Sequence, residues 1–313
     1  MENAIRYLIT GGAGFIGSSL CEFLVDKGHS VFVVDDLSTG YKNNLAPILK
    51  SITFYEEKIQ FFDFEILPKI DAVIHLAAQP SVPISIADFR NSSSGNILGT
   101  IKIIDYCSIN QIPLTYASSS AIYGNLELGS DVNSEIDLLS PYATDKYVME
   151  LYAKTAFKLY KLSSIGLRFF NVYGPRQDPN SPYSGVISIF IDRLLKGQNI
   201  TINGGYQTRD FIYVNDVVEI IFQSTVLTSG KQMCEHSNVL TGNSVSIDYL
   251  AKMLINHIEQ DVDINYQALS ISDPEKSSGS IKKMTELFGV DLKKMIPLNS
   301  GLSKTVDFIR DNN

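Results

Sequence analysis

Three glycines in the run GGAGFIG, at Gly11, Gly14 and Gly17, constrain the fold more than any other feature of the sequence. They come directly after a short apolar stretch at residues 7–10 and open a segment of helical periodicity at residues 15–27. Such a turn uses glycine for a tight bend, for close backbone approach to a pyrophosphate and for tight packing of helix against strand. The run therefore predicts a dinucleotide-binding unit at the start of the chain.

Along the rest of the chain, short apolar runs rich in β-branched residues alternate with longer helical segments. This alternation is typical of a doubly wound α/β domain, in which helices cover both faces of a parallel sheet. The pattern predicts strands over residues 7–10, 31–35, 52–55, 72–76, 114–118 and 164–168. It predicts the clearest helices over residues 15–27, 97–108 and 143–160.

The texture of the sequence changes after Phe170, where a proline-rich loop precedes shorter, less regular elements. We therefore expect a Rossmann domain over residues 1–170 and a smaller domain over residues 171–313. A strand-like stretch at residues 209–214 leads to Asn215, a possible cap for a helix that starts at Asp216. These signals predict that the chain returns to the large sheet over about residues 208–236.

Two carboxylates lie at the position that distinguishes NAD from NADP in dinucleotide-binding folds. Asp35 ends the second predicted strand, about 20 residues beyond the glycine run, where a carboxylate accepts hydrogen bonds from the adenosine ribose. Asp35 and Asp36 together would repel a 2′-phosphate, so the sequence favours NAD over NADP. The competing interpretation is an acidic strand end that is merely solvated, and the glycine run beside it makes that the weaker account.

Tyr142 and Lys146 stand four residues apart at the start of a predicted helix, which places both on one face. Use of a tyrosine as a base at neutral pH requires about 4 kcal/mol of preferential phenolate stabilisation, and a nearby ammonium has the right sign for this. Alone, the pair is a common accident on helices. Here Ser118, Ser119 and Ser120 precede it at the carboxyl end of a central strand, where doubly wound folds bind ligands. The combination predicts proton transfer beside a bound NAD.

Composition narrows the class of partner. The 313 residues carry a formal charge of -8 and show no basic cluster, which disfavours nucleic acid and anionic membranes and leaves a small ligand. No apolar stretch reaches roughly 18 residues and no leader-like start is visible, so we expect a cytoplasmic protein. The odd, dispersed cysteines, Cys21, Cys107 and Cys234, are interpreted as buried thiols, and the histidine spacing gives no reason to expect a metal.

Several motifs taken together resemble one family. They are GGAGFIG, DDLSTG, HLAAQPSV, NILGT, SSSAIYG, SPYATDK, RFFNVYGPRQDP and TRDFIYV, and they extend over nearly the whole chain. The sequence resembles the extended short-chain dehydrogenase/reductases, in the branch of nucleotide-sugar epimerases and dehydratases. The resemblance implies NAD as cofactor, a UDP-sugar as substrate bound by the smaller domain, and epimerisation at C4 of a UDP-hexose through a 4-keto intermediate. It also implies a homodimer, to which apolar residues around the predicted helices 97–108 and 143–160 point as well.

The resemblance also implies roles for individual residues. Ser119 holds the sugar O4 hydroxyl beside Tyr142, with Ser118 and Ser120 as secondary candidates, and Lys146 binds the nicotinamide ribose. The residues implied for the NAD site are Gly11, Gly14, Phe15, Ile16, Gly17, Asp35, Asp36, Leu37, Ser38, Thr39, Gly40, Ile59, Leu76, Ala77, Ala78, Asn96, Ser118, Tyr142 and Lys146. Those implied for the UDP-sugar site are Ser81, Ser119, Ser120, Tyr142, Asn171, Val186, Arg209 and Ser277.

Three residues of the UDP-sugar site have specific parts by this resemblance. Asn171 and Arg209 match positions that hold the UDP phosphates, and a guanidinium suits a pyrophosphate because it donates two parallel hydrogen bonds. Ser277 matches a position beside the sugar C2 substituent that is often tyrosine in family members restricted to plain hexoses. Its small side chain, with Ser278 and Gly279 beside it, implies room for an acetamido group.

The chain also departs from the family pattern. Lys58 and Ile59 stand where relatives usually carry an aspartate for the adenine amino group, and Ser270 stands where relatives commonly have an arginine for the pyrophosphate.

A 4,6-dehydratase would need an Asp-Glu pair where this chain has Ser120 and Ala121. A C4 reductase would usually need NADPH, and a non-catalytic relative tends to lose the tyrosine or the lysine. C4 epimerisation is therefore the favoured function, with these three as alternatives.

Overall fold

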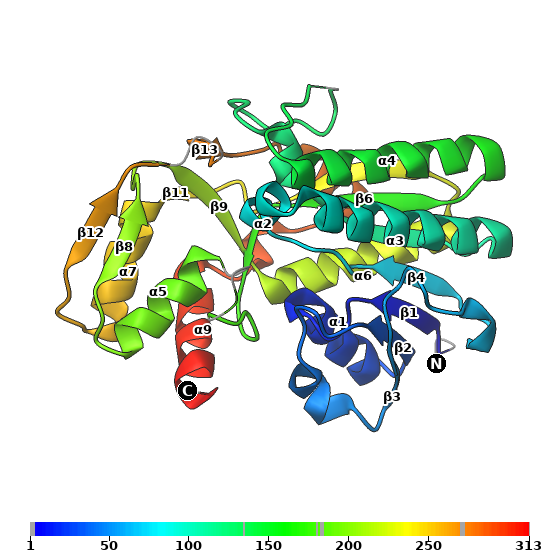
Figure 1. Ribbon diagram of the computed structural model, residues 1–313, viewed down its shortest axis with the longest axis horizontal. Coiled ribbons are helices and arrows are strands. Elements are labelled where there is room, and N and C mark those ends of the chain that lie inside the picture. Colours follow the sequence, from blue (N-terminus) through cyan, green and yellow to red (C-terminus); the bar gives the residue numbers. More distant parts are fainter. Residues whose placement is uncertain (1–3, 134, 180, 182–184, 270–272, 313) are drawn as a thin grey trace.

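A seven-stranded parallel sheet forms the larger part of the protein (Figure 1). The computed structural model describes residues 4–133, 135–179, 181, 185–269 and 273–312. The strands of the large sheet are β1 (Arg6–Thr10), β2 (Ser30–Asp35), β3 (Ile52–Glu56), β4 (Ala72–His75), β5 (Leu114–Ser119), β6 (Ser164–Phe169) and β10 (Cys234–Val239). Their order is β10-β6-β5-β4-β1-β2-β3, and every neighbouring pair is parallel. This confirms the doubly wound α/β fold, since each predicted strand lies within one residue of an observed one.

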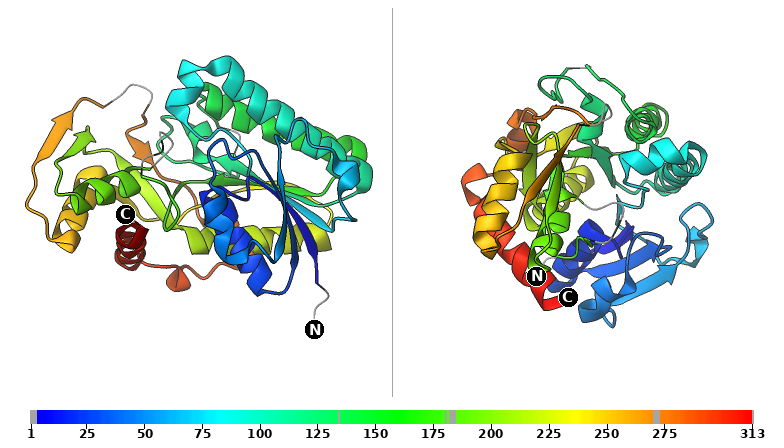
Figure 2. Two further views of the ribbon diagram at one scale, coloured as in Figure 1. Left: turned by 60° about the horizontal axis from the view of Figure 1, so that its bottom comes forward. Right: turned by 60° about the vertical axis from the view of Figure 1, so that its left-hand side comes forward.

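Helices cover both faces of this sheet. On one face lie α2 (Val82–Ala87), α3 (Phe89–Asn110) and α4 (Pro141–Tyr160), with α3 and α4 packed side by side. On the other lie α1 (Phe15–Asp26) and α6 (Val214–Gly230), which also contact each other (Figure 2). Neighbouring residues of β1 serve the two cores, because successive strand side chains point to opposite faces. Leu8 packs with Ile103 and Met149, whereas Ile9 packs with Leu20 and Leu24.

A smaller part of the protein lies beyond the carboxyl ends of the large sheet. It contains the parallel pair β8 (Ile200–Asn203) and β12 (Ile264–Gln267) and the helices α5 (Val186–Leu195), α7 (Ile247–Ile258) and α9 (Leu298–Asn312). A second sheet joins the two parts through β7 (Asn171–Tyr173), β9 (Thr208–Tyr213), β11 (Ser244–Ser246) and β13 (Lys276–Ser277). The remaining elements are α8 (Lys282–Phe288) and the 3₁₀ turns η1 (Lys42–Ile48), η2 (Phe64–Ile66), η3 (Ser120–Tyr123) and η4 (Leu292–Lys294). The domain boundary after residue 170 stays a prediction.

The chain returns to the large sheet through α6 and β10, but the strand expected at residues 209–214 does not join it. The stretch predicted at residues 209–214 forms β9, which pairs with β7, β11 and β13 instead of with the large sheet. The edge of β6 is occupied along its length by β10, so no partner position is left there for β9. Asn215 does not cap the next helix. The helix begins one residue before it, at Val214, and its cap position, Tyr213, makes no side-chain capping bond.

Two further expectations need adjustment. Helix α3 begins at Phe89, eight residues before the predicted start, because Asp88 accepts a hydrogen bond from the Asn91 N–H and caps a polar first turn. Cys21 and Cys107 are buried, but Cys234 is only half-buried because β10 forms the edge of the sheet.

Within the described residues, no helix is both long enough and apolar enough to cross a bilayer.

Candidate active site

A cavity of about 1300 Å³ opens along the carboxyl ends of the central strands and continues to the smaller part of the protein. Its walls include the glycine run after β1, Asp35 at the end of β2, Leu76 after β4 and Ser119 at the end of β5. At its far end it is lined by Arg209 on β9. This is the edge at which doubly wound sheets bind ligands.

The glycine run forms a tightly packed cradle in which added side chains would collide with the backbone. Gly11 has a φ of +72°, and a Cβ there would lie 2.6 Å from the Ala77 backbone nitrogen. A Cβ on Gly17 would lie 2.1 Å from the Gly11 carbonyl oxygen. The run leads into α1, whose cap position, Gly14, has no side-chain capping bond and whose first-turn residues Phe15, Ile16 and Gly17 line the cavity. The cradle therefore fits the pyrophosphate of a dinucleotide.

Asp35 is buried and held in one orientation. One carboxylate oxygen accepts from the Ala13 N–H and the other from the Leu37 N–H, both at 2.9 Å. Burial raises the pKa of Asp35, and the two backbone hydrogen bonds act against this. Beside it, Asp36 accepts from the backbone and the hydroxyl of Ser38. A fixed carboxylate at this edge fits the ribose hydroxyls of NAD.

Most residues expected at the cofactor and substrate sites line this cavity. They are Gly11, Gly14, Phe15, Ile16, Gly17, Asp35, Asp36, Ser38, Thr39, Ile59, Leu76, Ala77, Ala78, Asn96, Ser118, Ser119, Ser120, Tyr142, Lys146, Asn171, Val186, Arg209 and Ser277. Three expected residues are not in the lining. The Leu37 side chain packs on the core, Gly40 lies where a Cβ would meet the backbone of Ala13, and the Ser81 hydroxyl accepts from the Ile84 N–H to cap α2.

Tyr142 and Lys146 lie in the first turns of α4, which Ser140 caps and Pro141 starts. The Lys146 ammonium is buried, donates to the Ala117 carbonyl oxygen at 2.8 Å and lies 5.7 Å from the centre of the Tyr142 ring. The Tyr142 backbone N–H donates to the Ser85 hydroxyl on α2. The start of α4, which carries the pair, is thus held by contacts with β5 and α2.

The strand-end serines have different surroundings. Ser118 donates to a Glu150 carboxylate oxygen at 2.6 Å, so its hydroxyl is engaged inside the protein although the residue touches the cavity. The Ser119 hydroxyl accepts from the Ala121 N–H and interacts with the Tyr142 phenol. Ser119 is therefore better placed than Ser118 to contact a ligand beside Tyr142, and Ser120 also lines the cavity.

Asn96 connects three elements around the pair. Its side-chain oxygen accepts from the Gln79 N–H at 2.8 Å, and its amide donates to the Asp145 carboxylate at 3.1 Å. Gln79 belongs to the loop after β4, Asn96 to α3 and Asp145 to α4. The contact is consistent with the supporting role that the resemblance implies for this asparagine.

At the opposite end of the cavity the second sheet gathers the expected substrate residues. Asn171 on β7 donates to the Asp210 carbonyl and lies 3.5 Å from the Ser277 hydroxyl, and Ser277 is the register partner of Arg209. The Arg209 guanidinium forms an ion pair with Asp273. Ser270, the other position considered for the pyrophosphate, lies outside the described residues.

Comparisons with known proteins agree with this geometry. A model described as the NAD dependent epimerase/dehydratase family matches residues 7–234. The chain belongs to this family. It is 37% identical to a Methanocaldococcus jannaschii protein with a provisional UDP-glucose 4-epimerase name, over 98% of this chain and 99% of that one.

Two solved structures resemble this family member closely. One is the UDP-N-acetylglucosamine 4-epimerase of Methanobrevibacter ruminantium in complex with UDP-N-acetylmuramic acid, with 33% identity, a TM-score of 0.91, and coverage of 99% of this chain and 100% of that one. The other is the UDP-glucose 4-epimerase of Thermotoga maritima with UDP-glucose, with 33% identity, a TM-score of 0.89, and coverage of 98% and 99%. The family expected from the sequence motifs is confirmed.

Sequence reasoning missed several lining residues of this epimerase/dehydratase family member. Arg176 pairs with Glu22 on α1, and the Tyr41 hydroxyl donates to Asp178 at 2.6 Å, so the loop after β7 is tied to the Rossmann part beside the cavity. Arg176 and Asp178 lie inside the motif RFFNVYGPRQDP, which was therefore a usable signal. Asp273 has no comparable signal, because only the tertiary fold brings it to Arg209.

Burial dominates the electrostatics of the pair. Burial raises the pKa of Tyr142, while the contact with Ser119 acts to lower it. Desolvation therefore opposes the phenolate in the protein without its cofactor, and the phenolate stabilisation expected beside a bound NAD stays a prediction. Burial also lowers the pKa of Lys146 to about 8, with the Asp145 carboxylate acting in the opposite direction.

We expect Lys146→Met to stabilise the protein while it inactivates the enzyme. The folded state holds the Lys146 proton less tightly than the unfolded chain, so its charge costs stability at pH 7, and this cost disappears as the pH rises from about 8 to about 10. The free energy of unfolding at pH 7 should rise by up to about 3 kcal/mol, less the lost bond to Ala117. Denaturant titrations of both proteins without added cofactor check this. A variant that is less stable than the wild type at pH 7, or whose gain persists at pH 10, would contradict the argument.

Proposed function

We propose that the protein catalyses NAD-dependent epimerisation at C4 of a UDP-hexose, and that it accepts UDP-N-acetylhexosamines as well as UDP-glucose and UDP-galactose. One observation carries the proposal. Tyr142, Lys146 and Ser119 meet in a single cavity that joins a dinucleotide cradle at one end to Arg209 and Asn171 at the other. We propose that this cavity holds NAD and a UDP-sugar together.

The residues at the reacting centre have distinct parts in this proposal. The Tyr142 phenolate takes the proton from the sugar O4 hydroxyl, which the Ser119 hydroxyl orients, and returns it after the 4-keto sugar has presented its other face. The Lys146 ammonium would hold the nicotinamide ribose, and its positive charge favours the phenolate. When bound, NAD⁺ would supply an acceptor for the hydride from the sugar C4, a reduced form that returns this hydride, and a positive charge that also favours the phenolate.

The second sheet would hold the rest of the substrate. The Arg209 guanidinium is suited to the diphosphate because it can donate two parallel hydrogen bonds, and Asp273 keeps it oriented before the substrate binds. The Asn171 amide lies beside it on β7. Ser277 forms a small wall next to both residues and leaves room for a C2 substituent.

The alternatives lack support at specific positions. Ser120 and Ala121 come directly after Ser119 in the cavity lining, so the carboxylate pair of a 4,6-dehydratase is missing there. The fixed carboxylate of Asp35 disfavours the phosphorylated cofactor that a C4 reductase would usually need. A non-catalytic role does not account for the presence of both Tyr142 and Lys146.

One assay distinguishes these functions. The protein is incubated with UDP-glucose or UDP-N-acetylglucosamine and NAD⁺ equimolar with the enzyme, and the products are separated by chromatography. An epimerase forms the C4 epimer over many turnovers, and a dehydratase accumulates a 4-keto-6-deoxy sugar. A C4 reductase forms no product from either sugar, because neither has a ketone to reduce, and turns over only with a 4-keto sugar and added NADPH. Absence of any product from either substrate would contradict the proposal.

We also expect a homodimer. Helices α3 and α4 lie side by side on the outside of the sheet and expose apolar side chains, among them Leu98, Ile109, Leu151 and Leu159. Pairing of these helices across a two-fold axis would bury that surface. Light scattering at micromolar concentration should give about twice the 34.7 kDa monomer mass. A mass near that of the monomer would contradict the homodimer.

The cytoplasmic location also stays a prediction.

A further inference from the structure

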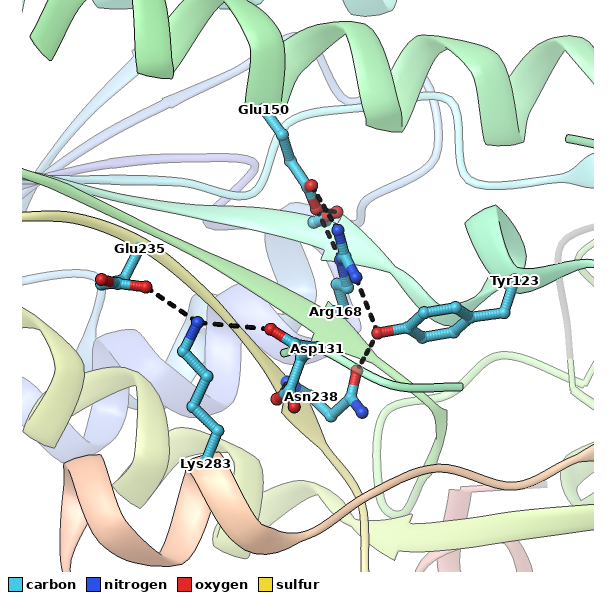
Figure 3. Close-up of polar contacts among 8 residues, drawn as sticks. Tyr123, Asp131, Glu150, Arg168, Glu235, Asn238 and Lys283 are labelled. Carbon is cyan, nitrogen blue, oxygen red and sulfur yellow. Dashed lines mark hydrogen bonds and ion pairs between the residues drawn. The ribbon is translucent and has the colours of Figure 1, made fainter. Parts of the chain in front are cut away.

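Arg168 and Glu150 form a buried ion pair next to the proposed catalytic residues on α4, and Figure 3 shows the pair and its polar contacts. Arg168 on β6 donates to both carboxylate oxygens of Glu150, at 2.9 and 2.7 Å, and the two side chains are only 3% and 7% exposed. Glu150 lies one turn after Lys146 on α4. Its carboxylate also accepts from Ser118, the residue before Ser119. The pair thus joins β5, β6 and α4 at the level of the reacting centre.

One hydroxyl group extends this network away from the catalytic layer. The Tyr123 hydroxyl accepts from the Arg168 guanidinium at 2.7 Å and donates to the Asn238 side-chain oxygen at 2.6 Å (Figure 3). It links the ion pair to Asn238, which lies on β10 and is fully buried. The ring of Tyr123 borders the cavity, whereas Asn238 is not among its lining residues.

Asn238 in turn holds a cavity wall. Its amide donates to the carbonyl oxygens of Gly129 and Ser280, both at 3.1 Å. Gly129 and residues 278–280 bind each other through backbone hydrogen bonds of 2.8 and 2.9 Å. Ser277 and Ser278 line the cavity, and β13, which ends at Ser277, is only two residues long. Ser244 and Glu127 hold the outer side of this wall through bonds to Ser277 and Ser278, and the Asn238 amide ties it from the buried side.

The fit around this tie is tight. A Cβ on Gly279 would lie 2.5 Å from the Phe170 ring and 3.1 Å from the Asn238 amide nitrogen. The Asn238 backbone N–H donates to the Asp131 carboxylate at 2.8 Å, and Lys283 on α8 contacts both the Asp131 carbonyl and Glu235 (Figure 3). Asn238 thus makes four hydrogen bonds through its side chain and its backbone N–H, and a different arrangement would leave some of these groups unpaired.

We propose that the Tyr123 hydroxyl and Asn238 form a clamp that positions the wall of residues 277–280 against the catalytic layer and so sets how the sugar of the UDP-sugar is held. Both are positioning residues, because the polar groups of both are engaged by other groups of the protein. The inference rests on the proposed function, which places a UDP-sugar at this wall. The clamp differs from the Ser277 side chain itself, which fills space at the wall without fixing where the wall lies.

Tyr123→Phe tests the clamp because it removes only the bridging oxygen. The dissociation constant for UDP-N-acetylglucosamine, measured by calorimetry, should rise about tenfold. That for UDP, which lacks the sugar, should change less than about twofold. KM for UDP-sugars should rise by a similar factor with kcat retained, because Arg168, Glu150 and Ser118 keep their mutual bonds. The ratio of kcat/KM for UDP-N-acetylglucosamine to kcat/KM for UDP-glucose should also shift. Partial unfolding of the variant cannot cause such a shift, because it lowers both values by the same factor.

Two further variants sharpen the test. Tyr116→Phe, the same change at another buried position on β5, should leave binding and the substrate ratio as in the wild type. Adding Tyr123→Phe to Asn238→Ala should weaken sugar binding no further than Asn238→Ala alone, because both changes break one tie. If Asn238→Ala does not fold, the single variant Tyr123→Phe decides.

The outcomes separate the clamp from the proposed function. Unchanged sugar affinity, KM and substrate ratio in Tyr123→Phe, or equal changes in Tyr116→Phe, would overturn the clamp and leave the epimerase proposal intact. A wild type that binds the UDP-sugar without epimerising it would overturn the function, while the calorimetric comparison would still test the clamp. A lower unfolding temperature with wild-type binding would reduce the network to a stabilising role and so overturn the clamp.

Discussion

Replacing Tyr142 by phenylalanine is expected to lower kcat by about 10²- to 10⁴-fold and to leave NAD bound. The change removes the hydroxyl that would take the proton from the sugar O4 hydroxyl, and it keeps the ring that borders the cavity. Without a proton acceptor at this point, removal of the C4 hydrogen as hydride would leave a protonated, positively charged carbonyl. The barrier therefore rises even though the substrate is held as before.

The measurement compares steady-state epimerisation and NAD affinity in the two proteins. Tyr147→Phe is a matched control, because Tyr147 lies on the same helix, packs against Ile122 and Tyr123 at the edge of a small core cluster, and is not among the lining residues. It should retain activity. Comparable turnover by Tyr142→Phe and the wild type would remove Tyr142 from the mechanism, and loss of NAD together with activity would show that the change disturbs the cofactor site instead.

Ser277→Tyr is expected to lower kcat/KM for UDP-N-acetylglucosamine by at least about 10²-fold, with a much smaller effect on UDP-glucose. Ser277 stands in register with Arg209, close to Asn171, in a wall that continues with Ser278 and Gly279. A tyrosine ring at this position would occupy the space proposed for the acetamido group. Because the wall is tied to Asn238 and Gly129, it has little freedom to move away from the added ring.

UDP-glucose is the internal control in this experiment, since it carries only a hydroxyl at C2. Ser277→Ala, which keeps the wall small and removes the hydroxyl, should retain both activities. The assignment of Ser277 is wrong if the wild type turns over only plain hexoses, or if the tyrosine variant handles the acetylated substrate as well as the wild type does.

Sequence reasoning located the features whose signals lie within a few consecutive residues. The cradle needs glycine at Gly11 and Gly17 because a Cβ there would meet backbone, so the run had to appear as glycines in the sequence. Tyr142 and Lys146 share a face because a helix repeats every 3.6 residues. The buried strands appear as apolar runs because helices cover both faces of the sheet. In each case the physical requirement is local, and the sequence shows it directly.

Contacts between distant segments could not be predicted in the same way. Ser118 and Ser119 are neighbours with the same side chain, but the Ser118 hydroxyl donates to Glu150 well inside α4, whereas Ser119, at the end of β5, caps η3 and interacts with Tyr142 at the start of α4. Ser81 looked like a ligand contact from its motif, and its hydroxyl is used to cap α2.

The sequence by itself determined the fold class, the dinucleotide cradle, the acidic strand end and the Tyr142/Lys146 pair. The tertiary structure alone decided that β9 belongs to the second sheet and that Asp273 pairs with Arg209. It also decided that Tyr123 and Asn238 join the wall at Ser277 to the catalytic layer. The difference has a physical reason. Helix period, strand burial and glycine turns are set by nearest neighbours along the chain, whereas a hydrogen bond between residues 115 positions apart depends on how whole elements pack.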